Sequence, residues 1–182
     1  MSLSPQELLS NIAKETCISR LKDLPVFTGI NITPKNKAAV LVPLFLKDGE
    51  LHLLFTLRSM RLKSHSGQVS FPGGKLEENE SVFDAALRET EEEIGVPTQL
   101  VDIWCEMPPV QGANKDMLIT PVVGIIKEVS VDNLNINIYE VDEVFSVPMS
   151  EFCDTSKHAH LKSDGLLTPV FMHKKHKIWD LF

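Results

Sequence analysis

The chain of 182 residues is 43% hydrophobic and 24% charged, which is enough to bury one core of ordinary domain size. Its 18 basic and 25 acidic residues give a net charge of −7. This balance argues against holding nucleic acid by neutralising phosphates, and a polyanionic substrate would need help from metal cations. No apolar run approaches the roughly 20 residues that span a bilayer, which excludes a membrane-embedded function.

Cysteine usage and the two ends of the chain bear on the compartment. Cys17, Cys105 and Cys153 are far apart and form no CxxC pair, so the sequence indicates neither a disulfide framework nor a structural zinc site. The first 23 residues hold balanced charges and no apolar signal core, which disfavours a secretory signal and a typical transit peptide. The last three residues are not a peroxisomal tripeptide. We therefore expect a reducing, intracellular location.

The first part of the chain predicts a helix and then two strands. Residues 5–23 have apolar side chains at roughly helical spacing, and a polar stretch with prolines follows to about residue 37. The runs 38–46 and 51–57, joined by a short turn, predict a hairpin. The first of these runs is nearly all apolar, so we expect it to be a central strand.

Two features dominate the middle of the chain. Residues 58–75 become basic, small and rich in glycine, which indicates a loop and a first candidate site. Ser81 then opens a helix, with Asp84 three residues later as a capping-box pattern, and Gly95 closes it.

Further strands and a second, short helix near 148–153 complete a mixed α/β sandwich around a central sheet. No internal repeat appears. Since the first helix and the polar stretch after it form a lead-in, we assign residues 1–36 to an N-terminal helix and lead-in, and residues 37–182 to one domain. The further strand-like runs are 100–107, 119–127, 144–147, 169–173 and 177–181.

The helix after Ser81 carries unusually many acidic residues at its end. At about 100° per residue, Glu89, Glu92 and Glu93 form a stripe beside the apolar one, so three carboxylates are expected to converge next to the core. With Glu91 they crowd the last turn, where the helix dipole favours cations and like charges repel. Mg²⁺ or Mn²⁺ would make this arrangement favourable and could bridge to substrate phosphates. The alternative is a solvated acidic face. The apolar stripe consists of Phe83, Ala86, Leu87, Thr90 and Ile94.

The spacing of this helix and of the glycine before it resembles the signature of the Nudix hydrolases, GX5EX7REUXEEXGU, where U is a bulky aliphatic residue. Every fixed position of the signature is filled, by Gly74, Glu80 and the run from Arg88 to Val96. The only departure is at the first U position, where Thr90 replaces a bulky aliphatic residue. The resemblance implies a Nudix-type α/β/α sandwich around a mixed β-sheet. It also implies hydrolysis of a nucleoside diphosphate linked to another moiety.

Carried over position by position, the resemblance implies roles for the site residues. Glu89 and Glu93 are the expected metal ligands, Glu92 contributes directly or through water, and the carbonyl of Gly74 joins them. A salt bridge from Arg88 to Glu80 would pin the loop to the helix. The expected catalytic set is Glu92, Glu93, Arg88 and Glu80.

Directly upstream, residues 54–74 resemble the coenzyme A diphosphatase motif, LLTxR(S/A)x3Rx3Gx3FPGG. Phe55 replaces the second Leu, and Lys63 replaces the second Arg, which keeps the charge but loses the planar fork of a guanidinium. Coenzyme A carries a 3′-phosphate beyond its diphosphate, so the basic residues Arg58, Arg61 and Lys63 are candidates to bind it. Alternatively, these residues are solvated or pair with Glu77 and Glu78, and His65 is expected to be a loop residue. The substrate-binding set implied by the motif is Arg58, Ser59, Lys63, Gly67 and Gly73.

The resemblance covers about residues 37–179 and is closest to the organellar animal enzymes of this branch. It implies a mitochondrial location, with a cytoplasmic one as the alternative. Glu140 and Glu143 are candidate functional carboxylates, or else belong to a polar strand edge or helix cap. Family members continue past the tryptophan with Gly and a long apolar helix, whereas Asp180 follows Trp179 here, so the final helix is expected to be missing or truncated.

These features predict a Mg²⁺- or Mn²⁺-dependent hydrolase that splits coenzyme A, and its acyl esters, into 3′,5′-ADP and 4′-phosphopantetheine or acyl-phosphopantetheine. The expected partner is a small-molecule substrate, with neither nucleic acid nor membrane, and no oligomeric state is predicted. A second hypothesis keeps the reaction but assigns ADP-ribose, a dinucleotide or a nucleoside triphosphate as substrate. A third is a catalytically weak Nudix-fold module that binds nucleotides or a partner protein.

Overall fold

The computed structural model describes residues 4, 7, 9–25, 34–112, 116–127, 129–163 and 166–179. Its longer α-helices are α2 (Asn11–Lys22) and α3 (Val82–Ile94), and Glu7 is also helical. Short 3₁₀ turns lie at Thr98–Leu100, Val131–Asn133, Met149–Cys153 and Thr155–Lys157. The strands are β1 (Asn36–Lys47), β2 (Glu50–Arg58), β3 (Val69–Ser70), β4 (Gly73–Lys75), β5 (Val101–Glu106), β6 (Val110–Gln111), β7 (Met117–Ile126), β8 (Val141–Pro148), β9 (His158–Ser163), β10 (Leu166–His173) and β11 (His176–Ile178).

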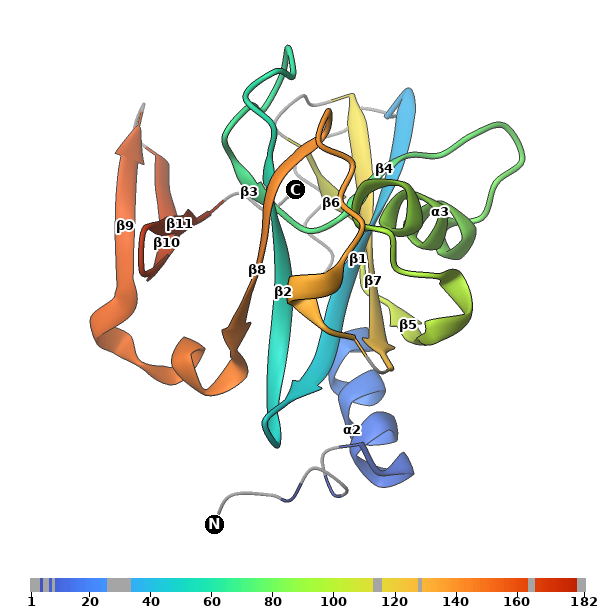
Figure 1. Ribbon diagram of the computed structural model, residues 1–182, viewed down its shortest axis with the longest axis vertical. Coiled ribbons are helices and arrows are strands. Elements are labelled where there is room, and N and C mark those ends of the chain that lie inside the picture. The colour runs from blue at the N-terminus through green and yellow to red at the C-terminus, as the bar shows by residue number, and fades with distance from the viewer. Residues whose placement is uncertain are drawn as a thin grey trace.

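A mixed eight-stranded sheet forms the centre of the molecule (Figure 1). Its main path is β3-β2-β1-β7-β5, with β4 paired to β1, β6 to β7 and β8 to β2. β1 runs parallel to β7 and antiparallel to β2 and β4. The apolar first run was predicted to be central, and this is confirmed, since β1 pairs with three other strands and buries Ala39 and Leu41 completely.

The two helices lie on opposite faces of this sheet. Ala85 and Ala86 of α3 pack against Ala39 and Leu41 of β1. The other face of β1 presents Leu44, and α2 packs there through Ile18 and Leu21. Because successive side chains of a strand point to opposite faces, the apolar residues of β1 serve both layers.

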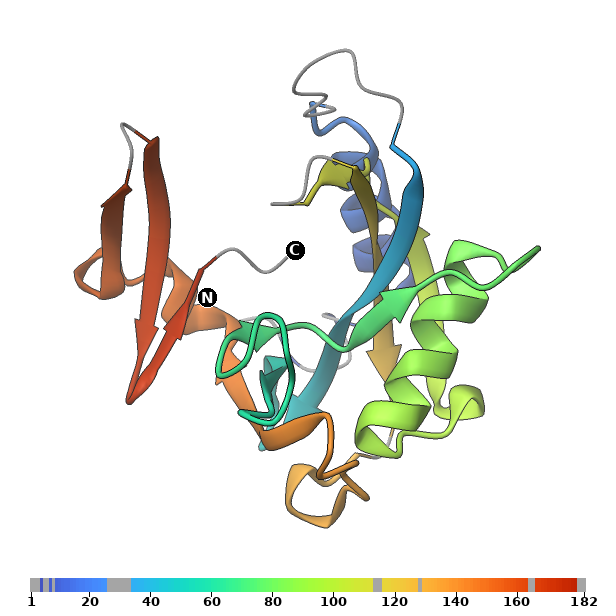
Figure 2. The same ribbon diagram turned by 90° about the horizontal axis from the view of Figure 1, so that it is seen from above.

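A second, three-stranded antiparallel sheet of β9, β10 and β11 stands beside the first (Figure 2). Phe171 and Ile178 from this sheet join a core cluster with Phe55, Phe145 and Val147 of β2 and β8. The predicted α/β sandwich around a mixed sheet is thus confirmed, with an additional small sheet.

Several local predictions need correction. The first helix begins at Asn11, because the Ser10 side chain accepts a hydrogen bond from the Ala13 amide and caps it there. The second helix near 148–153 is a short 3₁₀ turn, and strand β9 was not predicted. The expected strand 177–181 ends at Ile178, while residues 180–182, where the final helix was considered, lie outside the described residues. No helix in the described ranges is long and apolar enough to cross a membrane.

Candidate active site

Helix α3 begins and ends at the residues that the sequence indicated. The Ser81 hydroxyl accepts from the Asp84 amide at 3.1 Å and donates to the Asp84 carboxylate at 2.6 Å. At the other end Gly95 has φ of +70°, the left-handed conformation that glycine adopts without strain. The helix buries Ala85 in place of the expected Phe83, which is 37% exposed on the outer side.

Glu93 is a buried carboxylate at the junction of helix, loop and sheet. It is only 3% exposed, and its Oε2 accepts a hydrogen bond from the Gly73 amide at 3.2 Å. Arg58 Nη1 lies 3.6 Å from Oε1. Burial raises the pKa of Glu93 to about 8 despite the opposing charge of Arg58. The site therefore holds a carboxylate whose ionised form needs more positive charge than the protein supplies.

Glu89 lies one helical turn earlier and fits against the glycines of β4. A Cβ atom on Gly74 would overlap the Glu89 carboxylate, so only glycine allows this close approach. At Gly73, where φ is +154°, a side chain would overlap the Ala39 carbonyl and the Val40 backbone. Burial raises the pKa of Glu89, as do the nearby charges of Glu92 and Glu140, although Arg88 opposes this shift.

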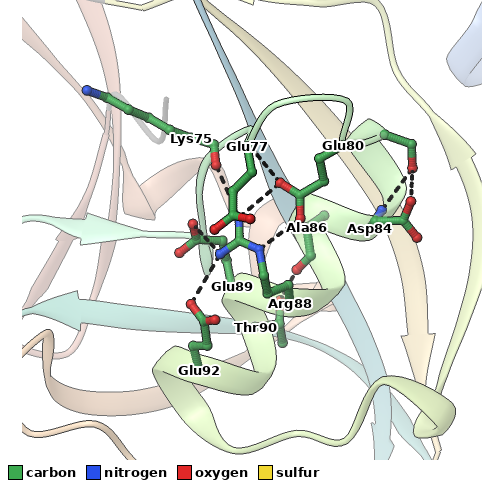
Figure 3. Close-up of polar contacts among 10 residues, drawn as sticks. Lys75, Glu77, Glu80, Asp84, Ala86, Arg88, Glu89, Thr90 and Glu92 are labelled. Atoms are coloured by element: carbon green, nitrogen blue, oxygen red, sulfur yellow. Dashed lines mark hydrogen bonds and ion pairs between the residues drawn. The ribbon is translucent and has the colours of Figure 1, made fainter.

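Arg88 is the centre of a polar network that ties the loop to the helix (Figure 3). It forms a bidentate pair with Glu80, at 2.8 Å from Nε and 3.0 Å from Nη2, which confirms the predicted salt bridge. Nη2 also donates to the Lys75 carbonyl at 3.2 Å. Nη1 donates to Glu89 at 3.0 Å and to Glu92 at 3.2 Å.

The three carboxylates do not converge as expected. Glu89 and Glu93 turn inward, but the Glu92 side chain is 57% exposed and pairs with Arg88. Glu92 lies about 100° around the helix from Glu93, and the packing of the helix on the sheet turns this position outward. Figure 3 shows Glu92 and Glu89 reaching the guanidinium of Arg88 from the same helix.

Strand β2 and the loop after it contribute Arg58 and scaffold residues. The Arg58 Nε is buried without a hydrogen-bond partner among the described residues, and the side chain is 25% exposed. Ser59 is fully buried, and its hydroxyl donates to Asp142 at 2.9 Å. Asp142 also accepts a hydrogen bond from the Met60 amide at 2.9 Å. No sequence motif indicated these two contacts of Asp142.

The remaining loop residues lie further out. Lys63 is exposed, and no ion pair to Glu77 or Glu78 is found for it in the described part of the chain. Gly67 has φ of +69°, and its amide donates to the Arg58 carbonyl at 3.0 Å, closing the loop. His65 bonds Gln68 at 2.8 Å, as expected of a loop residue.

The two late carboxylates have different surroundings. Glu140 lies close enough to Glu89 and Glu93 for its charge to raise the pKa of both. Glu143 instead pairs with Lys175 at 2.8 Å and with His176 at 3.4 Å, beside β11. Glu140 therefore acts electrostatically on the carboxylate site, whereas Glu143 has its own cationic partners.

The donor set fits a hard divalent cation. Carboxylate oxygens are the ligands that Mg²⁺ and Mn²⁺ prefer, and the raised pKa of Glu93 marks a place where a cation would offset the cost of burial. The absence of a side chain at Gly74 lets the Glu89 carboxylate lie against the backbone of β4. Within the described residues, no group of three acidic, His or Cys side chains is arranged around one point, since Glu89 and Glu92 bond to Arg88.

A mixed sheet with a glycine strand laid against a carboxylate-bearing helix defines the Nudix class of fold. A family model described as the NUDIX domain matches residues 35–164. The chain therefore belongs to the Nudix hydrolase family, and it is a pyrophosphohydrolase of that family.

The curated relatives include a coenzyme A diphosphatase, the predicted branch. The chain is 39% identical over 151 residues to the mitochondrial coenzyme A diphosphatase NUDT8 of Mus musculus, covering 79% of this chain and 71% of that protein. It is 37% identical over 163 residues to Nudix hydrolase 3 of Caenorhabditis elegans, covering 82% and 68%. A solved Nudix hydrolase of M. smegmatis, RenU, shares the fold with a TM-score of 0.55 at 20% identity, over 71% of this chain and 80% of that one.

Proposed function

We propose that this chain hydrolyses the diphosphate bond of coenzyme A, and of acyl-coenzyme A, to give 3′,5′-ADP and 4′-phosphopantetheine or its acyl ester. The observation that carries the proposal is the contact of Arg58 and Gly73 with Glu93. Through it the motif that resembles coenzyme A diphosphatases and the carboxylates of the Nudix box form one site. The similarity to mitochondrial NUDT8 supports the same substrate and a mitochondrial location.

Glu89 and Glu93 would hold Mg²⁺ or Mn²⁺, with the Gly74 carbonyl beside them and Glu92 contributing directly or through water. When bound, the cation would neutralise charge on the diphosphate oxygens and lower the pKa of a coordinated water. Arg88 and Glu80 are positioning residues. Their bidentate pair, together with the hydrogen bond from Arg88 to the Lys75 carbonyl, holds the loop against the helix.

Arg58 is the residue best placed to meet the diphosphate. Its Nη1 lies beside Glu93, and its buried Nε has no protein partner in the described ranges. A guanidinium in this position can donate to a phosphate oxygen while it offsets the charge of Glu93. We therefore assign Arg58 to the diphosphate and not to the 3′-phosphate, and we assign Ser59, Gly67 and Gly73 to shaping the loop. Lys63 stays a candidate for the outer part of the substrate.

The test is hydrolysis of coenzyme A beside dephospho-coenzyme A and ADP-ribose, with Mg²⁺, with Mn²⁺ and with chelator, and with products separated chromatographically. Metal-dependent release of 3′,5′-ADP, with a clear preference for coenzyme A, is expected. Equal turnover of all three would replace the substrate with a broader diphosphate class. No turnover on folded protein would favour a binding module.

A further inference from the structure

Two segments far apart in the sequence are joined at the rim of the site. Arg61 Nη1 donates to the Ile138 carbonyl at 2.8 Å, and the Ser59 amide donates to the Glu140 carbonyl at 2.8 Å. Asp142 adds its bonds to the Ser59 hydroxyl and the Met60 amide. The backbone of the turn at 137–140 is therefore held firmly against the start of the loop at 59–61.

Three side chains carried by these two segments are nonetheless largely exposed. Tyr139 is 71% exposed, Met60 is 71% exposed and Ile138 is 60% exposed. The Arg61 guanidinium carbon lies 5.9 Å from the centre of the Tyr139 ring. Within the turn, the Tyr139 amide donates to the Asn137 side chain at 3.1 Å, which fixes the backbone that carries the ring. A fixed backbone with an exposed aromatic ring and a cation is suited to contact a ligand.

The chain places this surface beside the reacting groups. Tyr139 is followed directly by Glu140, whose charge acts on Glu89 and Glu93, and adjacent Cα atoms are about 3.8 Å apart. Arg61 comes three residues after Arg58, which contacts Glu93. A molecule whose diphosphate lies at the carboxylates can therefore reach Arg61 and Tyr139 with one of its ends.

We propose that Arg61 and Tyr139 form a platform on which the adenine of the substrate stacks. This inference rests on the proposed function, because it places the diphosphate at Glu89 and Glu93. A planar base matches a phenol ring and a guanidinium, both of which offer flat faces. A flexible pantetheine chain has no flat face to match. Tyr139 and Arg61 are thus specificity-determining residues that select a nucleotide at this end.

The platform can be tested without turnover, because Tyr139 is the single tyrosine of the chain. Protein labelled with 3-fluorotyrosine gives one ¹⁹F resonance that reports on this ring alone. With Mg²⁺ present, we expect 5′-AMP and 3′,5′-ADP to shift this resonance by the ring current of the base, and 4′-phosphopantetheine to leave it unchanged. A shift with phosphopantetheine alone, or with none of the three, would overturn the proposal.

Steady-state kinetics of variants give a second test of the platform. Tyr139→Ala is expected to raise KM for coenzyme A roughly five- to a hundred-fold, the range for loss of one stacked base, with kcat nearly unchanged. Tyr139→Phe should restore KM, since it keeps the ring. Leu167→Ala, which changes an apolar residue that is 61% exposed on β10, is the control and should behave as the wild type. An unchanged KM in Tyr139→Ala would exclude the platform. If the ¹⁹F shift occurs but no variant or wild type turns over substrate, the platform stands and the hydrolase proposal fails.

Discussion

Glu93 combines burial, a raised pKa and contact with Arg58, so it is the carboxylate whose loss should cost most. We expect Glu93→Gln to lower kcat by about 10²–10³-fold, because the amide keeps the shape but loses the charge that holds a cation. Glu92→Gln, at a side chain 57% exposed, should lower kcat less. Steady-state kinetics at saturating Mg²⁺ measures both, and equal losses would place Glu92 in the centre as well.

The variant Glu93→Gln should also differ from the wild type in its melting temperature, Tm. The pKa of Glu93 is raised in the folded chain to about 8, so the protonated form stabilises the fold at low pH, and this contribution is lost as pH rises toward 8. Metal-free Glu93→Gln should therefore have a Tm at pH 8 at or above that of the wild type. A lower Tm would show that the loss of activity reflects unfolding.

Gly74 tests the close approach of backbone and carboxylate. Gly74→Ala inserts a methyl group into the Glu89 carboxylate, and we expect metal affinity or activity to fall about 10–100-fold, as for other displaced supports of metal ligands. Gly112→Ala is the matched control, because its added Cβ would lie 3.1 Å from the flexible end of Ile119. Titration of turnover with Mn²⁺ separates the two variants, and a wild-type curve for Gly74→Ala would remove Glu89 from the metal centre.

At the scale of elements, β8 and the turn before it carry two carboxylates with opposite environments. Glu140→Ala should lower kcat, because the negative charge that acts on Glu89 and Glu93 would also help to attract a divalent cation. Glu143→Ala should leave kcat unchanged, because Glu143 pairs with Lys175 and His176 away from the site. Turnover of the two variants measured side by side decides the matter. A loss in Glu143→Ala alone would reverse the assignment.

Helix α3 shows what local sequence signals can predict. Its cap residues Ser81 and Gly95 are local chemistry, and the structure confirms both ends. Strand β4, by contrast, consists of Gly73–Lys75, which has no strand propensity and pairs only because β1 lies beside it. Likewise, Asp142 stands between two other acids, Glu140 and Glu143, and only the fold brings it to Ser59, 83 residues away. Tertiary contacts of this kind produce no hydrophobic periodicity and no local motif in the sequence, so they cannot be predicted from it.

The candidate site divides in the same way. The sequence predicted the Arg88–Glu80 pair, which the structure confirms, because the fixed spacing between the loop and the helix determines it. The roles of Glu89 and Glu93 as metal ligands, which the resemblance implies, stay predictions. The sequence could not show that Glu92 faces outward, which depends on the exact rotation of the helix against the sheet. Nor could it separate Glu140, which lies in the turn before β8, from Glu143, which lies within β8 opposite Leu57. The division of the chain at residue 37 stays a prediction.

For the molecule as a whole, the attachment of the small sheet should depend on pH. The His176 ring stacks on Phe145 with centroids 3.8 Å apart and is 6% exposed. Burial lowers the pKa of His176 below its ordinary value of 6.5, although Glu143 opposes the shift. A His with a lowered pKa contributes stability above about pH 6.5, and this contribution is lost as pH falls through the lower, folded value.

We therefore expect Tm to fall on acidification below about pH 6.5. His176→Phe keeps the ring contact but removes the titrating group, so its Tm should depend less steeply on pH. His160→Phe, at an exposed position of β9, is the control. Thermal melts of the three proteins across this range test the prediction, and parallel curves for wild type and His176→Phe would contradict it.

The parallel pairing of β1 with β7 has a consequence for synthesis on the ribosome. Asn36 pairs with Met117, and Leu44 pairs with Ile125. Strand β1 therefore cannot complete its pairing until a segment about 80 residues further along the chain has been synthesised. The whole signature from Gly74 to Val96 emerges in between. Because contacts of long sequence separation form late, the nascent chain presents a glycine loop and an acidic helix on half a sheet until β7 is made. Chaperones that shield apolar strands would meet the exposed edge of β1 during that interval.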